Sequence, residues 1–552
     1  MDYRIRQISS MEKVLGKDTK EYPEIFKRTV IRGERVSYQI ILNSPERSFI
    51  SVKAVSPFGD NLKLYKVKDA PMDVPVTVDA EGEDYITLKP SLMPEILIPL
   101  EETNMGVMSY KYNQAIRVSL DIPKDFEAGT YEISLEFTAK VASDEETEAV
   151  DLEDKKMTLE VINEAIPEQK LIYTRWFYAD CIADIHNAEI YSEKHWDLIE
   201  KYIKAATNVG INMILVPIHT PPLDTAIGSY RPCVQLVDIE KKGDTYHFDF
   251  KKFHRFIEIS KKHGIKYFEM AHMFSQWGAK YSPNIKVTEN GKTDYMFGWH
   301  IPSNSKEYVS FLKQYIKALS KELEKEGIAE NTYFHISDEP TEKNIASYEE
   351  AKNIIKPLIG KSKTFDALSH ADFYKKGLVE CPVTAVNNIK EFLELDVPDQ
   401  WIYYCCGPQV GFLNSFMAMP LYRVRVLGFL LYKYNIKGFL HWGFNFYNAE
   451  RSDYRINPYL TTGADGAFPS GDAFIVYPGE NTVYSSIRGD ATFEAIQDMD
   501  IAYRLEELIG RDEVIKMIDD WAGMDLHFDN YPKDSSFLEN LREAMIKKIS
   551  EL

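Results

Sequence analysis

Eight short apolar segments, each long enough for one β-strand, recur between residues 171 and 444, and this repeat constrains the fold more than any other feature. Amphipathic stretches separate the segments, most clearly at 305–326 and 343–359. Strands that alternate with helices predict a parallel sheet covered by helices. The predicted strands are LIYTRWFY (171–178), NMILVPI (212–218), KYFEMAH (266–272), TYFHIS (332–337), KTFDALS (363–369), PVTAVN (382–387), QWIYYCC (400–406) and KGFLHWGF (437–444).

Eight strand–helix repeats over this length predict a (β/α)8 TIM barrel, a fold of about 250 residues. A doubly wound open sheet is the alternative architecture. Its glycine-rich, phosphate-binding turn is missing after the first predicted strand, however, so the barrel is favoured.

The first 165 residues have a different pattern, with almost no helical periodicity. Short alternating runs such as 35–42 (RVSYQIIL), 114–120 (QAIRVSL) and 130–137 (TYEISLEF) are separated by Pro, Gly and Asp turns. Several such strands predict an all-β sandwich. The acidic segment 143–156 predicts a solvated hairpin loop, and EAIPEQ at 164–169 predicts a linker.

The chain after the eighth predicted strand contains a loop rich in Gly, Pro and Asp, followed by two helical segments near 490–522 and 533–551. We expect these helices to pack on the outside of the barrel. The predicted fold is therefore multidomain. It has a β-sandwich domain at 1–165, a catalytic barrel at 170–489 and a C-terminal helical extension at 490–552.

Charge and composition exclude several kinds of partner. The 85 acidic and 65 basic residues give a formal net charge of −20, and no cluster of Lys and Arg suits a nucleic acid. No stretch approaches the roughly 20 apolar residues of a membrane helix, so we expect no membrane insertion. The odd count of five cysteines, and no apolar signal segment in MDYRIRQISS, indicate a reduced cytoplasmic protein.

Two adjacent carboxylates, Asp338 and Glu339, follow the fourth predicted strand in TYFHISDEP. The carboxyl ends of the strands form the active site of a TIM barrel. Like charges oppose each other's ionisation, so one of the pair should keep its proton to a higher pH, and a proton donor beside a charged partner suits glycosidic cleavage. An acidic helix N-terminus is the alternative explanation, but the position on the barrel rim favours catalysis.

This pair, the sandwich before the barrel and the late block YPG…SIRGDATFEAIQDMDIAYRL together resemble glycoside hydrolase family 123, which contains β-N-acetylgalactosaminidases. The resemblance covers nearly the whole chain. It implies retaining, exo-acting hydrolysis of a terminal 2-acetamido sugar from an oligosaccharide or glycoconjugate. The substrate's own acetamido oxygen would attack the anomeric carbon and form an oxazolinium ion. No cofactor is implied.

The resemblance also implies a role for each carboxylate. Asp338 would orient the acetamido N–H and balance the developing positive charge. Glu339 would protonate the leaving oxygen and then deprotonate the incoming water. Because an internal nucleophile needs no enzymic carboxylate below the sugar, the two acids can lie side by side, whereas a conventional retaining enzyme separates them by about 5 Å.

Other side chains near strand ends are candidates for sugar binding, each with a structural alternative. Trp442 would form an apolar floor under the sugar or the acetamido methyl, or else be a buried barrel residue. Tyr404 would hydrogen-bond the acetamido carbonyl, although strand parity does not decide between Tyr403 and Tyr404. The remaining candidates are Asn445, His272, Trp299 and Asn387.

Histidines near the predicted rim raise the alternative of a metal-dependent hydrolase. The first strand lacks a His-x-His pair and no HExxH occurs, so we expect no catalytic metal. Cys405 and Cys406 are predicted to be buried thiols. Two alternatives stay open: a glycosidase with a separate carboxylate nucleophile, and a non-catalytic sugar-binding barrel. The sequence does not indicate the configuration at the sugar's C4 or the oligomeric state.

Overall fold

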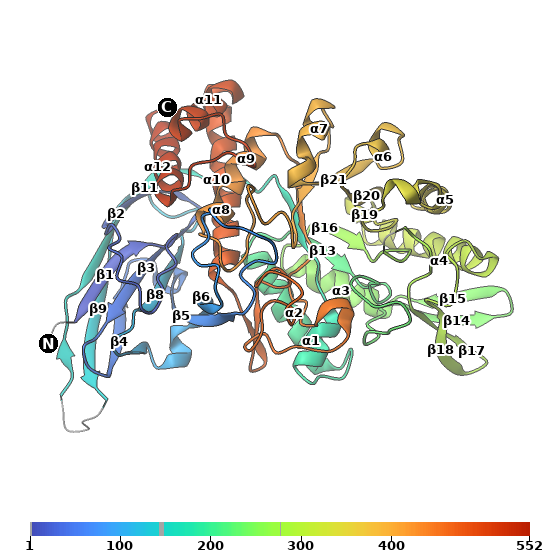
Figure 1. Cartoon of the computed structure of the whole chain (residues 1–552), viewed down its shortest axis with the longest axis horizontal. Helices are drawn as coiled ribbons and strands as arrows, with labels where there is room; N and C mark the ends of the chain where they lie inside the picture. Colours follow the sequence, from blue (N-terminus) through green and yellow to red (C-terminus); the bar gives the residue numbers. More distant parts are fainter. Residues whose placement is uncertain (1–2, 143–147, 277) are drawn as a thin grey trace.

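A computed structural model of the chain describes residues 3–142, 148–276 and 278–552. It confirms the predicted fold: an N-terminal sheet domain is followed by a closed, eight-stranded parallel barrel and C-terminal helices. Figure 1 shows the sheet domain in blue at one end of the molecule, with the barrel beside it. Residues 143–147 of the expected acidic loop lie outside the described residues.

The sandwich is built from two mostly antiparallel sheets, in the orders β1-β3-β8-β5-β6 and β2-β11-β9-β4-β7, with β10 paired to β9. The three strands named from the sequence are present as β3, β8 and β9. Ile40, Ile116 and Ile133, one from each, are fully buried in its core. The strands are β1 Arg4–Ser9, β2 Lys27–Arg32, β3 Arg35–Asn43, β4 Ser48–Val55, β5 Leu62–Met72, β6 Ser91–Pro99, β7 Gly106–Ser109, β8 Gln114–Asp121, β9 Gly129–Val141, β10 Val150–Asp151 and β11 Lys155–Ala165.

The eight barrel strands pair in sequence order, and the first closes the ring against the last. Each overlaps one of the predicted apolar segments. The strands pack tightly. A Cβ added to Gly438 would lie only 2.0 Å from the indole of Trp401 on the neighbouring strand, so this position requires glycine. The strands are β12 Ile172–Arg175, β13 Met213–Val216, β16 Tyr267–Met270, β19 Thr332–Phe334, β20 Lys363–Leu368, β21 Cys381–Ala385, β22 Trp401–Tyr403 and β23 Gly438–His441.

Helices cover the barrel, and the two predicted most clearly appear as α4 and α5. The α4 helix begins after Ser305, whose hydroxyl accepts a hydrogen bond from the N–H of Tyr308 at 3.2 Å, as an N-cap does. No described helix is both long and apolar enough to span a membrane. The helices are α1 Ala179–Ile185, α2 Glu193–Asn208, α3 Lys251–Lys262, α4 Lys306–Lys325, α5 Ile345–Ile355, α6 Asp372–Lys375, α7 Ile389–Glu394, α8 Tyr422–Arg425 and α9 Leu427–Lys433.

A four-stranded sheet that the sequence did not predict lies outside the barrel, in the order β15-β14-β17-β18. One hairpin comes from the loop after β13 and the other from the loop after β16, and β14 pairs with β17 in parallel. A single hairpin is only marginally stable, so this sheet forms by joining two distant loops. Its strands are β14 Asp238–Lys242, β15 Thr245–Asp249, β17 Ile285–Glu289 and β18 Lys292–Phe297; β24 Tyr477–Gly479 and β25 Thr482–Tyr484 form a separate ribbon.

The C-terminal helices contact both domains. Glu494 of α10 forms ion pairs with Arg117 of the sandwich at 2.9 Å and with Arg425 of the barrel at 2.8 Å. Figure 1 shows α10 between the two domains, and α12 packs against β2 and β11 of the sandwich. The C-terminal helices therefore pack on the sandwich as well as on the barrel. The predicted boundaries of the three domains stay predictions. Their bounds are α10 Ile487–Ile509, α11 Arg511–Ala522 and α12 Ser535–Glu551.

Candidate active site

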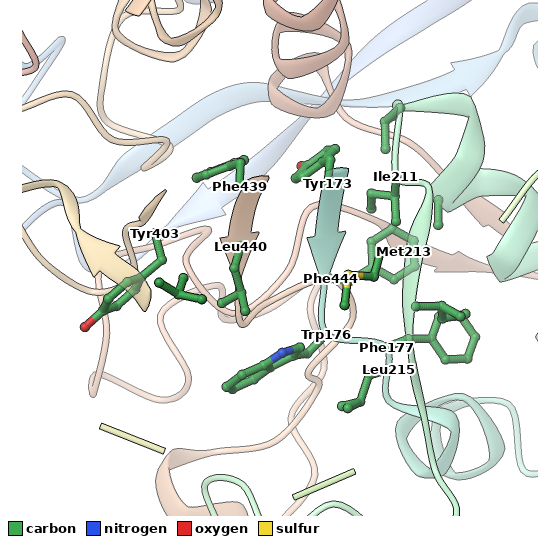
Figure 2. Close-up of a cluster of buried hydrophobic side chains, with 14 of the residues drawn as sticks. Tyr173, Trp176, Phe177, Ile211, Met213, Leu215, Tyr403, Phe439, Leu440 and Phe444 are labelled. Atoms are coloured by element: carbon green, nitrogen blue, oxygen red, sulfur yellow. The ribbon is translucent and has the colours of Figure 1, made fainter. Parts of the chain in front are cut away.

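A pocket lies at the carboxyl ends of the barrel strands, where TIM barrels place their active sites. Figure 2 shows Trp176, Leu440 and Tyr403 at this end of β12, β23 and β22. The lining combines aromatic and aliphatic faces with a few carboxylates, which is the composition of a small-ligand site. It consists of Trp176, Leu223, Asp224, Gln276, Asp338, Glu339, Ala367, Tyr403, Cys405, Cys406, Leu440, Trp442 and Phe468.

Asp338 and Glu339 both line this pocket, on the loop that follows β19. The side-chain amide of Gln276 donates to Asp338 Oδ2 at 3.3 Å, and the hydroxyl of Tyr403 donates to Glu339 Oε1 at 2.7 Å. Glu339 has a φ of 42°, in the left-handed region that costs a non-glycine residue about 1–2 kcal/mol. Backbone strain of this kind is concentrated at functional sites.

The electrostatics of the pair favour a retained proton. Burial and then the negative charge of Glu339 raise the pKa of Asp338 to about 7. Asp338 is only 8% exposed, so water screens this repulsion weakly. Near neutral pH Asp338 is therefore partly protonated in the free protein, whereas an ordinary aspartic acid would be ionised.

A buried charge network lies beneath the pair. His335 contacts Glu269 through Nε2 at 2.9 Å and Asp366 through Nδ1 at 3.3 Å. Burial alone would lower the pKa of His335, but the hydrogen bonds to Asp366 and Glu269 outweigh it and raise the pKa to about 9. The imidazole is therefore a cation held between two buried carboxylates.

This network fixes the loop that carries the catalytic candidates. The N–H of Ile336 donates to both oxygens of Asp366 at 3.2 Å, and the Ser337 hydroxyl donates to the carbonyl of Ser275 at 3.2 Å. Together with His335, three consecutive residues before Asp338 are thus anchored to neighbouring strands and loops. The anchored segment limits where the two carboxyl groups can point.

Trp442, the predicted apolar floor, lines the pocket. Its Nε1 donates to Asp472 Oδ2 at 2.8 Å, and its ring packs edge-on against Phe446 and Phe468 with centroids 5.1 and 5.3 Å away. Burial raises the pKa of Asp472 to about 7. Because the indole is held at its nitrogen and at its ring, it presents a fixed apolar face.

The structure decides between the two tyrosines that parity left open. Tyr403 reaches the pocket and contacts Glu339. Tyr404 is fully buried against Phe439 and His441, with centroids 5.0 and 5.5 Å away, and does not line the pocket. Successive strand residues point to opposite faces, so only one of the two can face the site. The prediction that Tyr404 faces the site is therefore corrected: Tyr403 is the tyrosine that lines the pocket.

Asn445 and His272 are buried outside the pocket lining. The Asn445 side chain accepts from the N–H of Tyr178 at 2.9 Å and donates to its carbonyl at 3.0 Å, so its hydrogen-bonding capacity is used structurally. The His272 ring stacks on His335 with centroids 3.9 Å apart. The structure does not bring either side chain to the carboxylate pair.

Trp299 and Asn387 also lie outside the pocket lining. Trp299 donates its Nε1 hydrogen to the carbonyl of Ser229 at 2.9 Å and packs edge-on against Tyr281. Asn387 is exposed. Trp299 was chosen from the loop FGWHIP and Asn387 from the end of the sixth predicted strand, and neither position specifies the direction of a side chain.

Four polar or aromatic residues of the pocket were missed from the sequence: Trp176, Asp224, Gln276 and Phe468. Trp176 lies near the end of the first predicted strand, so its position in the sequence was a usable signal. Gln276 and Asp224 lie in long loops without a recognisable motif. Burial raises the pKa of Asp224 to about 6, and this carboxylate accepts the N–H of Arg451 at 3.0 Å.

The histidines do not assemble into a metal site in the part of the chain that the structure describes. There, no three His, Cys, Asp or Glu side chains are grouped so that they could hold a metal ion. His219 and His272 are buried, and burial lowers the pKa of each, which keeps both rings neutral. His335 serves instead in the charge network beneath the carboxylate pair.

Comparisons with known proteins relate this architecture to a described family. The family model "Glycoside hydrolase 123, catalytic domain" matches residues 176–504, more than half of the chain. A solved family 123 glycoside hydrolase from Clostridium perfringens, described in connection with glycolipid glycan hydrolysis, is 16% identical with a TM-score of 0.70, covering 100% of this chain and 98% of its own. This likeness shows a shared fold along the whole chain.

Other comparisons add little. A GH10 xylanase from Thermobacillus composti is 10% identical over 50% of this chain and 85% of its own. Its TM-score of 0.28 is too low to support an inference. No curated protein sequence matches the chain.

We predict that His335→Gln removes a pH-dependent part of the stability. The pKa of His335 is raised to about 9, so its charge stabilises the folded chain fully below about pH 6.5, and this stabilisation is lost as the pH rises through about 9. The shift corresponds to about 3 kcal/mol. In urea unfolding between about pH 7 and pH 10, the wild-type midpoint should fall further than that of the variant.

The matched control is His247→Gln, on the exposed face of β15. Its midpoint should follow the wild-type curve at every pH. Parallel curves for the wild type and His335→Gln would contradict a charged imidazole between Glu269 and Asp366.

Proposed function

The chain belongs to glycoside hydrolase family 123 and is a glycoside hydrolase, and on this premise we propose that it is an exo-acting, retaining β-N-acetylhexosaminidase. It removes a terminal 2-acetamido sugar, with N-acetylgalactosamine preferred, by substrate-assisted catalysis through an oxazolinium ion. Membership of a hydrolase family decides against a non-catalytic sugar-binding barrel.

The observation that carries this proposal is the adjacency of Asp338 and Glu339 at one side of the pocket. A conventional retaining enzyme requires a nucleophile and an acid about 5 Å apart on opposite faces of the scissile bond. Two adjacent carboxylates on one anchored loop suit a different mechanism, in which the substrate itself supplies the nucleophile. Holding the acetamido oxygen beside the anomeric carbon also gains effective molarity.

Asp338 and Glu339 then have distinct roles. The acetamido N–H donates to Asp338, which favours its ionised form, and the proton of Asp338 moves to Glu339. Glu339 protonates the leaving oxygen, and Asp338 balances the positive charge of the oxazolinium. Glu339 next takes a proton from the water that opens the ring. Gln276 and Tyr403 support these roles, because each donates a hydrogen bond to one carboxylate.

The apolar part of the pocket suits the sugar. Trp442 and Trp176 offer flat faces, and Leu440 lies between β22 and β12 on the same rim. We place the acetamido methyl or the sugar face against Trp442. The relative from Clostridium perfringens is described with glycolipid glycan hydrolysis, so the glycan of a glycolipid or other glycoconjugate is the substrate class that we propose.

Asp224 favours a second candidate mechanism, because it is a further carboxylate in the pocket lining. In that mechanism Asp224 is the nucleophile and forms a glycosyl-enzyme with a sugar that needs no acetamido group. Its hydrogen bond from the Arg451 N–H and its pKa of about 6 leave it ionised at neutral pH, as a nucleophile must be.

The acid role of Glu339 predicts a dependence on the leaving group. Glu339→Gln should lower kcat/KM for natural glycosides by about 10²–10⁴-fold, the usual contribution of a general acid. Nitrophenyl glycosides should lose much less, because their leaving oxygen needs little protonation. Steady-state kinetics on both substrate types, with Glu342→Gln on the following turn as a control, make the measurement. Equal losses on the two types would remove Glu339 from this role.

The proton on Asp338 predicts a pH profile. The active free enzyme carries one proton on the pair, so kcat/KM should fall as the pH rises through about 7, the raised pKa of Asp338. Asp338→Asn removes the neighbouring negative charge that holds this proton. The alkaline limb of the residual activity should therefore move to lower pH, while KM changes little. An alkaline limb that stays in place would mean that the pair does not titrate together.

The nucleophile is tested by the acetamido group itself. Fluorine withdraws electron density from the acetamido oxygen, so kcat should fall steadily across the mono-, di- and trifluoroacetamido substrates. Plain β-galactosides should not be cleaved. A flat fluorine series with cleavage of β-galactosides would favour Asp224 as nucleophile, and Asp224→Ala would then abolish turnover. Under substrate assistance, Asp224→Ala should leave the slope of the fluorine series unchanged.

A further inference from the structure

The mechanism proposed above leaves two side chains of the pocket wall unused. Cys405 and Cys406 are consecutive residues that both line the pocket, immediately after β22. Both thiols are free, and their sulfur atoms lie 3.8 Å apart. The chain's remaining cysteines are isolated from them in sequence: Cys181, Cys233 and Cys381.

The backbone of this pair is held in place. The side-chain amide of Asn414 donates to the carbonyl of Cys405 at 3.0 Å, and that of Gln409 donates to the carbonyl of Cys406 at 2.8 Å. The backbone on both sides of the pair is therefore fixed, and the two sulfurs lie 3.8 Å apart, close enough for a hydrogen bond between the thiols. A ligand that needs both sulfurs finds them already ordered, which lowers the entropy cost of binding.

The separation of the sulfurs suits a bridge of one atom. A disulfide would require them to close to about 2.05 Å. Two bonds of about 2.3 Å, the zinc–sulfur length in proteins, span about 3.8 Å when they meet at a tetrahedral angle. A zinc site needs further protein ligands, however, and among residues 3–142, 148–276 and 278–552 no three His, Cys, Asp or Glu side chains are placed so that they could hold a metal ion. An atom that bridges the two sulfurs must therefore need only these two thiols as protein ligands.

We propose that Cys405 and Cys406 form a dithiol site in the pocket wall that binds trivalent organoarsenicals and blocks the active site. Trivalent arsenic with one organic substituent needs two sulfur ligands, which this pair supplies. In the reaction with an arsonous acid, R–As(OH)2, two As–O bonds break and two As–S bonds form. Each thiol proton leaves with a hydroxide as water, so two waters are released and no atom is oxidised or reduced.

The adduct should interfere with the catalytic residues. Tyr403, which donates its hydrogen bond to Glu339, lies two residues before Cys405 in the chain. The organic substituent on the arsenic would project from the wall into the space bordered by Trp442 and Glu339, which line the same pocket. Substrate and arsenical should therefore exclude each other.

The thiols should also distinguish this reagent from ordinary alkylating agents. The hydrogen bond to Cys406, followed by burial, raises the pKa of the Cys405 thiol, so little of it is ionised at neutral pH. Alkylation by iodoacetamide depends on the thiolate and should be slow. Exchange of hydroxide for thiol at arsenic proceeds from the protonated thiols and gains from both sulfurs at once.

The experiment treats the full chain with one equivalent of phenylarsine oxide and follows intact mass. The wild type should gain one phenylarsenic group with loss of two thiol hydrogens. Tryptic mapping should place this mass on peptide 391–423, whose cysteines are Cys405 and Cys406 alone. Cys405→Ser and Cys406→Ser should each lose the stable adduct, whereas Cys233→Ser, at a partly exposed thiol elsewhere, should keep it.

Activity gives the second readout. Turnover of an aryl glycoside should fall at least tenfold in the treated wild type, relative to its untreated sample, and recover with dithiothreitol but not with the same concentration of mercaptoethanol. No adduct on peptide 391–423, or an adduct there without loss of turnover, would overturn the proposal. The mass readout does not depend on which sugar is cleaved, so it stands or falls separately from the proposed function.

Discussion

Closure of the barrel is the constraint on which the site depends. The first strand, β12, pairs with the last, β23, in the register Ile172 to Gly438, although these residues lie far apart in the chain. An open edge would leave backbone N–H and C=O groups unpaired, and closure satisfies them. Because all eight strands run parallel, closure brings their carboxyl ends to one rim. Trp176, Asp338 and Trp442 meet there only for this reason.

Within that frame, the buried charge network determines how the carboxylate pair is presented. A cation at His335 between Glu269 and Asp366 satisfies two carboxylates that would be costly alone in the interior. The same Asp366 binds the backbone that leads to the pair. The site therefore combines an interior salt bridge, which holds the loop, with a neighbouring carboxylate pair whose mutual repulsion retains a proton.

The late sequence block, which carries part of the family resemblance, has a structural role. Most of it forms α10, whose Glu494 is shared by Arg117 of the sandwich and Arg425 of the barrel. Arg488 of the same helix pairs with Glu95 at 2.7 Å in the fully buried interior. Removing one partner of such a pair would leave an uncompensated buried charge, so these ion pairs stabilise the contact between the domains. None of these residues lines the pocket.

The sequence by itself determined the eight strands, the sandwich before them and the position of Asp338 and Glu339 at a strand end, because each of these follows from local periodicity and chain order. It did not determine the four-stranded sheet outside the barrel, since two separate loops must meet to form it. Nor could it choose Tyr403 over Tyr404, exclude Asn445, or find Gln276 and Asp224. Those outcomes depend on the direction in which a side chain points and on whether another group already uses its hydrogen bonds. Only the tertiary structure decides both, because it brings distant segments into contact.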